Sequence, residues 1–80
     1  MTPAELRVRA EYNSIAEASE ASGVARATIA AWERGSGERA PKRERVEVLA
    51  RAYGVEWVDL RLAIQRKREA AHEIRNQESI

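Results

Sequence analysis

The sequence is 80 residues long, which allows one small domain, since a chain of this size buries only about 60 to 65% of the surface that its unfolded form exposes. It contains no cysteine and a single histidine, His72, which excludes a disulfide framework and argues against a metal site. Arginine and lysine number 14 and aspartate and glutamate 13, for a formal net charge of +1, so the chain as a whole is not strongly basic.

Charge is nevertheless distributed unevenly along the chain. Residues 26–45 carry six arginines and lysines against three glutamates, a net of +3, whereas residues 4–23 carry two arginines against four glutamates, a net of −2. This distribution predicts a local basic face. The sequence has no run of 18 apolar residues and no apolar stretch of a secretion signal near Met1, so we expect a soluble cytoplasmic protein.

The composition predicts an all-α fold, because alanine, glutamate and arginine dominate and no segment alternates apolar with polar residues. Thr2, Pro3 and Glu5 are typical of a helix start, and we predict that this first helix continues to about Tyr12. Its predicted inward residues are Leu6, Val8 and Ala10.

A second helix is predicted to begin after Asn13 or Ser14, where Glu17 follows Ser14 at capping-box spacing. Its predicted inward residues are mostly small: Ile15, Ala18, Ser19 and Ser22. Gly23 then provides a position that tolerates positive φ, which a tight turn between helices needs.

A third helix is predicted from about Ala25 to Gly35. Its buried stripe consists of Val24, Ile29 and Trp32, and its outward face of Arg26, Ala27, Thr28, Ala31 and Arg34. Long acidic and amide side chains, which usually cover a solvent-facing helix, are almost missing from this face. The face is therefore predicted to contact something other than water.

Two further helices are predicted after a charged loop. The first of them is predicted to run from Lys42 to Tyr53 and to end at Gly54. The second is predicted to begin near Glu56. The inward residues of the former are Val46, Leu49, Ala50 and Tyr53. The latter carries a stripe at helical spacing that consists of Trp57, Leu60, Ile64, Lys67, Ala71 and Ile74. The two tryptophans are interpreted as core residues.

Residues 14–35, SIAEASEASGVARATIAAWERG, resemble the helix-turn-helix of the Cro/repressor (XRE) group in the lambda-repressor-like superfamily. The resemblance rests on Ser19 four residues before the turn glycine Gly23, on Val24 and Ile29 after it, and on the ending WERG. The later stretch VEVLARAYGVEWVDL is similar to the closing helices of that group. The resemblance implies a five-helix lambda-repressor-like domain over residues 1–60, followed by a C-terminal helical extension over residues 61–80.

The resemblance also implies how the chain contacts DNA. In a helix-turn-helix the helix after the turn, here the one predicted from about Ala25, enters the major groove, which is about 12 Å wide. The helix before the turn, here the one that begins near Ser14, crosses the phosphate backbone. Base reading is assigned to Arg26, Ala27 and Ala31, with the arginine pairing with guanine and the alanines contacting thymine methyls. Phosphate contacts are assigned to Ser14, Thr28, Arg34, Arg39, Lys42 and Arg43, with Arg45 as a further candidate. Surface solvation stays an alternative for these basic residues.

Two assignments concern contacts between helices. Glu33 is expected to pair with Arg7 or Arg9, which would fix the fold. A dimer contact is assigned to Leu60, Ile64, Ala71 and Ile74. Alternatively, Leu60 and Ile64 complete the monomer core and the rest of the helix is a solvated tail.

These assignments lead to a functional hypothesis: a double-stranded DNA-binding transcriptional regulator, acting in the nucleoid as a homodimeric repressor of a phage or other mobile element. One alternative is an antitoxin that binds a toxin protein and regulates its own synthesis. Another is a helical adaptor that binds only proteins. The sequence offers no catalytic triad, paired carboxylates or phosphate loop, so we expect no enzymatic activity, no cofactor and no metal.

Overall fold

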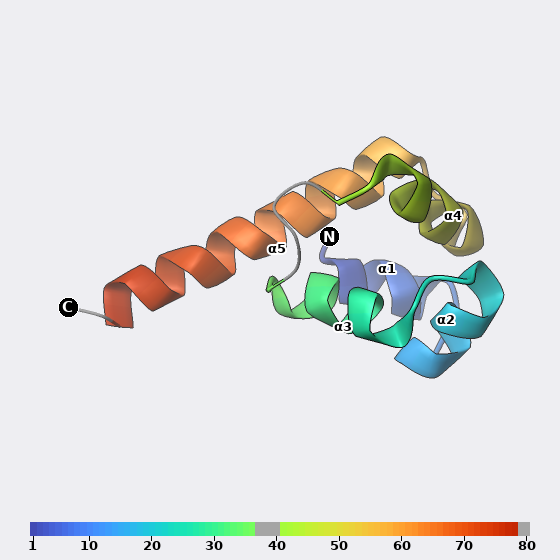
Figure 1. Cartoon of the computed structure of the whole chain (residues 1–80), viewed down its shortest axis with the longest axis horizontal. Coiled ribbons are helices and arrows are strands. Elements are labelled where there is room, and N and C mark those ends of the chain that lie inside the picture. The colour runs from blue at the N-terminus through green and yellow to red at the C-terminus, as the bar shows by residue number, and fades with distance from the viewer. Residues whose placement is uncertain (37–40, 79–80) are drawn as a thin grey trace.

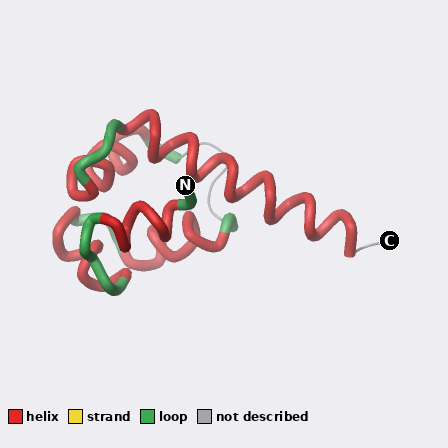
Figure 2. Tube along the Cα trace, turned by 180° about the vertical axis from the view of Figure 1, so that it is seen from behind, coloured by secondary structure: helices red, strands yellow, loops and turns green. Residues whose placement is uncertain are grey.

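The computed structural model describes the backbone of residues 1–36 and 41–78 and the side chains of residues 1–36 and 41–73. Within these ranges the chain forms helices and no strand, as the composition predicts. The helices are α1 (Pro3–Arg9), α2 (Ile15–Ser22), α3 (Arg26–Arg34), α4 (Arg43–Tyr53) and α5 (Trp57–Glu78). Helices α1, α3 and α4 pack against the N-terminal part of α5, and α2 packs on α3 and α4. The C-terminal part of α5 extends away from the other helices (Figures 1 and 2). No described helix is long and apolar enough to cross a membrane.

Helix α1 starts where the sequence predicts and ends three residues earlier. The Thr2 hydroxyl accepts from the N–H of Glu5 at 3.2 Å, and the Glu5 carboxylate accepts from the N–H of Thr2 at 3.1 Å, which completes a capping box. The helix ends at Arg9 because Glu11 adopts a φ of 69°, which helical backbone does not allow. The predicted continuation to Tyr12 was therefore wrong.

The end of α1 changes the role of two neighbouring residues. Val8 is 57% exposed, so its predicted inward orientation was wrong, because it lies about 200° around the helix from the buried Leu6. Tyr12, outside the helix, packs on α4 instead: its hydroxyl donates to the carbonyl of Ala52 at 3.3 Å, and its ring centroid lies 6.1 Å from that of Tyr53.

The core contains residues from all five helices, and it confirms most of the predicted inward faces. Its buried apolar residues are Leu6, Ala18, Val24, Ile29, Trp32, Val46, Leu49, Ala50, Tyr53, Leu60, Ala63 and Ile64. Trp57 packs against this cluster while staying partly exposed. Burial raises the pKa of the Tyr53 phenol well above its ordinary value.

An ion pair ties α1 to α3. The Arg7 Nε and Nη2 atoms donate to the two carboxylate oxygens of Glu33 at 2.8 and 3.3 Å, and Nη1 donates to the carbonyl of Tyr12 at 2.9 Å. The two side chains are only 13% and 11% exposed. The hydrogen bond to Glu33 raises the pKa of the Arg7 guanidinium. Arg7 is thus the partner of Glu33, whereas the guanidinium of Arg9 contacts the sulfur of Met1 at 3.7 Å.

A close approach joins the end of α3 to α5. Gly35 caps α3 with a φ of 78°, and a Cβ at this residue would lie 2.7 Å from the carbonyl oxygen of Lys67 and 2.9 Å from the Cβ of Ala71. The apolar stripe of α5 can therefore include a lysine, because the contact at Lys67 is made by its backbone. The C-terminal part of α5 extends away from the other helices (Figure 1).

We predict that Glu33→Ala lowers the free energy of unfolding by about 2 kcal/mol, because it leaves the largely buried Arg7 guanidinium without its carboxylate partner. The control is Glu47→Ala, which removes the ion pair with Arg43, whose side chains are 66% and 35% exposed. That change is expected to cost at most about 0.5 kcal/mol. Urea denaturation of both variants measures the difference, and equal losses would contradict the structural role given to the Arg7–Glu33 pair.

We predict that Gly35→Ala destabilises the protein by at least about 3 kcal/mol, because the methyl group combines an unfavourable positive φ with overlap on the α5 backbone. Gly54→Ala is the matched control, since Gly54 has a φ of 70° with nothing within 4 Å of its added Cβ. This change should cost only the strain of placing alanine at a positive φ, about 1 to 2 kcal/mol. Chemical denaturation of the two variants tests the contact, which a similar loss in both would rule out.

Candidate nucleic-acid interface

Helices α2 and α3 form a compact pair joined by the three-residue turn Gly23 to Ala25. Gly23 takes a φ of 80° and its N–H donates to the carbonyl of Ser19 at 2.8 Å, which ends α2. Ala18 of α2 and Ile29 of α3 are completely or almost completely buried. Because the side chain of Ala18 is only a methyl group, α3 can pack closely against α2.

Two serines hold the turn in place. The Ser19 hydroxyl donates to the carbonyl of Val24 at 2.6 Å. The Ser22 hydroxyl donates to the carbonyl of Ala18 at 2.7 Å and accepts from the N–H of Val24 at 3.1 Å. These bonds satisfy backbone groups that the end of α2 and the turn would otherwise leave unpaired. The sequence analysis predicted that these serines point inward but did not predict their hydrogen bonds. The only signal in the sequence was the presence of two hydroxyl residues, three positions apart, at the C-terminal end of α2.

The outward face of α3 is accessible in the first turn of the helix, and most of its side chains are small. Arg26 and Ala27 are exposed, and Ala31 lies one turn further along the same side, partly exposed. The cap residue Ala25 provides no side-chain hydrogen bond, so the first N–H groups of α3 point outward with the positive end of the helix dipole. Because the alanine side chains on this face are short, the backbone of α3 can come close to a binding partner.

A groove of about 480 Å³ lies beside this face, between the turn and α4. Thr28 lines it from α3, and Glu44, Arg45 and Val48 line it from α4. Helix α4 also begins without a side-chain cap, at Lys42. One residue assigned to a phosphate contact, Thr28, thus lines the same groove as Arg45.

Other assigned phosphate-binding residues already have partners within the chain. The Arg43 guanidinium carbon lies 4.3 Å from the centre of the Trp57 ring, and its Nε donates to Glu47 at 2.7 Å. Arg34 Nε donates weakly to the hydroxyl of Ser36 at 3.4 Å. Arg39 lies outside the described residues.

Ser14 acts as the N-cap of α2. Its hydroxyl oxygen accepts from the N–H of Glu17 at 3.2 Å, which leaves the hydroxyl proton for an external acceptor. The predicted capping box is only half formed, because the Glu17 carboxylate accepts from the N–H of Asn13, at 3.2 Å, instead of from that of Ser14.

The four residues assigned to a dimer contact have different environments. Leu60 and Ile64 are buried in the core, so their side chains present no surface in the folded monomer. Ala71 is partly covered by the end of α3 at Gly35. The side chain of Ile74 lies outside the described residues.

A comparison with protein families finds a match between residues 4–60 and a helix-turn-helix family model. These residues include almost all of α1, the whole of α2 to α4 and the first turn of α5. The match therefore covers most of the packed part of the molecule, while the core residues Ala63 and Ile64 lie just beyond it. Neither the curated proteins nor the solved structures contain a significant match.

We predict that Ser22→Ala lowers the free energy of unfolding by about 1 to 2 kcal/mol, since it leaves the N–H of the buried Val24 without an acceptor. Ser36→Ala is the control, because the Ser36 hydroxyl only accepts a long hydrogen bond at the surface and its loss should change stability by less than about 0.5 kcal/mol. Urea denaturation compares the two, and an unchanged Ser22→Ala midpoint would show that the hydroxyl is dispensable.

Proposed function

The chain belongs to the Cro/repressor (XRE) family of helix-turn-helix proteins, and we propose that it is a homodimeric repressor that reads a specific operator with α3. Because the family consists of DNA-binding transcription regulators, DNA-dependent regulation is the general function of the chain. The observation that supports the more specific proposal is the outward face of α3, where alanines surround one exposed arginine in an uncapped first turn.

Base reading follows from the chemistry of this face. The guanidinium of Arg26 can donate two hydrogen bonds to guanine O6 and N7 in the major groove. Ala27 and Ala31 can contact thymine methyl groups, since an apolar side chain of this size meets that methyl without displacing the helix. Arg26 is then the only hydrogen-bonding reader among the three residues, and it carries most of the discrimination.

Phosphate contacts position the helix without reading sequence. Thr28 and Arg45, which line one groove beside α3, and Lys42 at the uncapped start of α4 are the best placed. Ser14 retains a hydroxyl proton for this purpose. Arg34 and Arg43 contribute only if their present hydrogen bonds are exchanged for bonds to phosphate. Bound at an operator, two such domains would block polymerase.

The antitoxin alternative is favoured by one observation, the C-terminal part of α5, which extends away from the other helices (Figure 2). A helix that leaves its own core can lie in a groove of another protein. Copurification of one small protein in fixed stoichiometry with the full chain would support this alternative, and its loss on truncation after Ala71 would locate the contact.

We predict that Arg26→Ala weakens binding to the preferred duplex by about 1 to 3 kcal/mol and removes the preference for guanine at one position of each half-site. The preferred site is first selected from a random duplex pool, and affinities are then measured by fluorescence anisotropy over a salt series. Arg61→Ala, an exposed arginine on α5, is the control for loss of one positive charge. It should lower affinity uniformly or leave it unchanged.

Two results would overturn the proposal. If Arg26→Ala and Arg61→Ala behave alike, Arg26 does not read bases. If the pool yields no enriched sequence and affinity does not fall as salt rises, α3 does not bind DNA as proposed, since every phosphate contact gives a salt dependence.

A further inference from the structure

Arg43, the first residue of α4, is held by two other side chains. Its Nε atom donates to a carboxylate oxygen of Glu47, one turn further along α4, at 2.7 Å. Its guanidinium carbon lies 4.3 Å from the centre of the ring of Trp57, the first residue of α5. The side chain is nevertheless 66% exposed. Arg43 is thus held on its Nε edge and on one face of the guanidinium, while most of its surface faces solvent.

These two contacts are not needed to keep α4 against α5. The two helices share the buried core at Val46, Leu49 and Leu60, and burial of such side chains stabilises a fold far more than a polar contact at the surface. An exposed ion pair and an exposed cation–π contact are both weak. A stronger acceptor can therefore displace them with little effect on the fold.

DNA phosphate is such an acceptor. A guanidinium binds phosphate oxygens through two parallel N–H donors, and these charge-assisted bonds are strong. The first turn of α4 lies where phosphate contacts are proposed, because Arg45 lines the groove beside α3 together with Thr28. Lys42, directly before Arg43, is exposed. The long, exposed side chain of Arg43 can turn toward a phosphate at the same turn of the helix.

We propose that Glu47 competes with DNA phosphate for Arg43 and thereby sets the affinity of the chain for DNA. In the free protein Glu47 and Trp57 hold the guanidinium. When DNA binds, the guanidinium exchanges Glu47 for phosphate and leaves the ring of Trp57 uncovered. The inference rests on the proposed DNA binding and adds to it a residue that acts through Arg43 without contacting DNA itself.

This competition affects affinity and leaves sequence preference unchanged. The fraction of molecules in which Arg43 is free limits the apparent affinity for any duplex. Phosphate contacts carry no sequence information, so Glu47 lowers the affinity for the preferred site and for other DNA by the same factor. Loss of Glu47 should therefore raise affinity with the same preference, whereas loss of Arg26 should remove a preference.

A double-mutant cycle in the full chain tests the competition. Fluorescence anisotropy measures the affinity of wild type, Glu47→Ala, Arg43→Ala and the double variant for a duplex with one preferred half-site and for a scrambled duplex. Glu47→Ala should raise the affinity for both duplexes by about twofold to fivefold. The same change should have little effect once Arg43 is alanine. Circular dichroism checks that all variants keep their helix content.

Glu44→Ala is the control for the loss of one negative charge. Glu44 is exposed in the same turn of α4 and lines the groove beside α3. Its loss should raise affinity by the same factor with and without Arg43, because it only relieves repulsion of phosphate. If Glu47→Ala also acts equally in both backgrounds, Glu47 acts through its charge alone and the proposal is wrong. An unchanged affinity in Glu47→Ala would overturn it as well.

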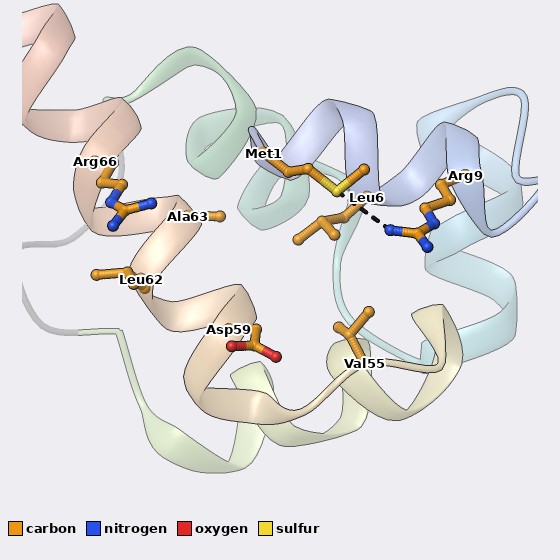
Figure 3. Close-up of a pocket in the computed structure, with 8 residues that line it drawn as sticks. All are labelled: Met1, Leu6, Arg9, Val55, Asp59, Leu62, Ala63 and Arg66. Atoms are coloured by element: carbon orange, nitrogen blue, oxygen red, sulfur yellow. Dashed lines mark hydrogen bonds between the residues drawn. The ribbon is translucent and has the colours of Figure 1, made fainter.

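Salt dependence shows whether Arg43 reaches phosphate. Arg43→Ala should lower the slope of log affinity against log salt by about 0.9, the value of one lost phosphate contact. Arg66→Ala is the matched control, because Arg66 is exposed and lines a groove between α1 and α5 to which α3 and α4 contribute no residue (Figure 3). Its loss should leave the slope unchanged.

The emission of Trp57 gives a readout that does not depend on affinity. It should shift to longer wavelength when DNA binds, because the ring loses its cover and becomes more exposed to water. The shift should be absent from Arg43→Ala and from Trp57→Phe. If Arg43 only joins α4 to α5, DNA binding changes neither this emission nor, in Arg43→Ala, the salt slope, and that result would overturn the proposal.

The same measurements separate this inference from the proposed function. If the wild type prefers one half-site sequence and Glu47→Ala binds like the wild type, the competition is wrong and reading by α3 stands. If the wild type shows no sequence preference but the cycle behaves as expected, reading by α3 is wrong and the competition stands. A wild type that binds neither duplex would overturn both.

Discussion

The ion pair between Arg7 and Glu33 determines how α3 is held. Three nitrogen atoms of Arg7 are used, two on the carboxylate of Glu33 and one on the carbonyl of Tyr12, and the hydroxyl of Tyr12 reaches Ala52 on α4. One guanidinium thus joins α1, α3 and, through Tyr12, α4. Because Glu33 lies in the last turn of α3, this network fixes the helix at its C-terminal end and leaves the first turn, with Arg26, at the surface.

Small residues fix the other contacts of α3. Ala18 allows its approach to α2, and Gly35 allows its C-terminal end to lie against the backbone of α5 at Lys67. A larger residue at either position would displace α3 as a unit, since packed interiors transmit a local change in volume. The orientation of the outward face of α3, which we propose reads DNA, therefore depends on residues outside that face. The same packing that stabilises the domain sets this orientation.

The sequence was sufficient to predict features that depend on local spacing, and insufficient for those that depend on what covers a face. The stripe of Ile29 and Trp32 and the terminal glycines Gly35 and Gly54 were correctly located, because helical period and positive φ are local properties. The early end of α1 was missed, since Glu11 takes a positive φ that nothing in its residue type requires. Periodicity also identified Leu60 as apolar without showing that the core covers it. Base and phosphate contacts stay predictions.

The composition of α3 explains why a second copy would matter. If α3 reads bases as proposed, its one bidentate arginine would give about 1 to 3 kcal/mol of discrimination and its alanines only methyl contacts, so a single domain would distinguish its site from other DNA only weakly. A regulator must find its operator among a very large number of competing sites, and it gains specificity when two half-sites are read together. The proposed homodimer would couple two such readers. On this view the low, alanine-rich surface that lets α3 approach the bases also makes the protein depend on dimerisation.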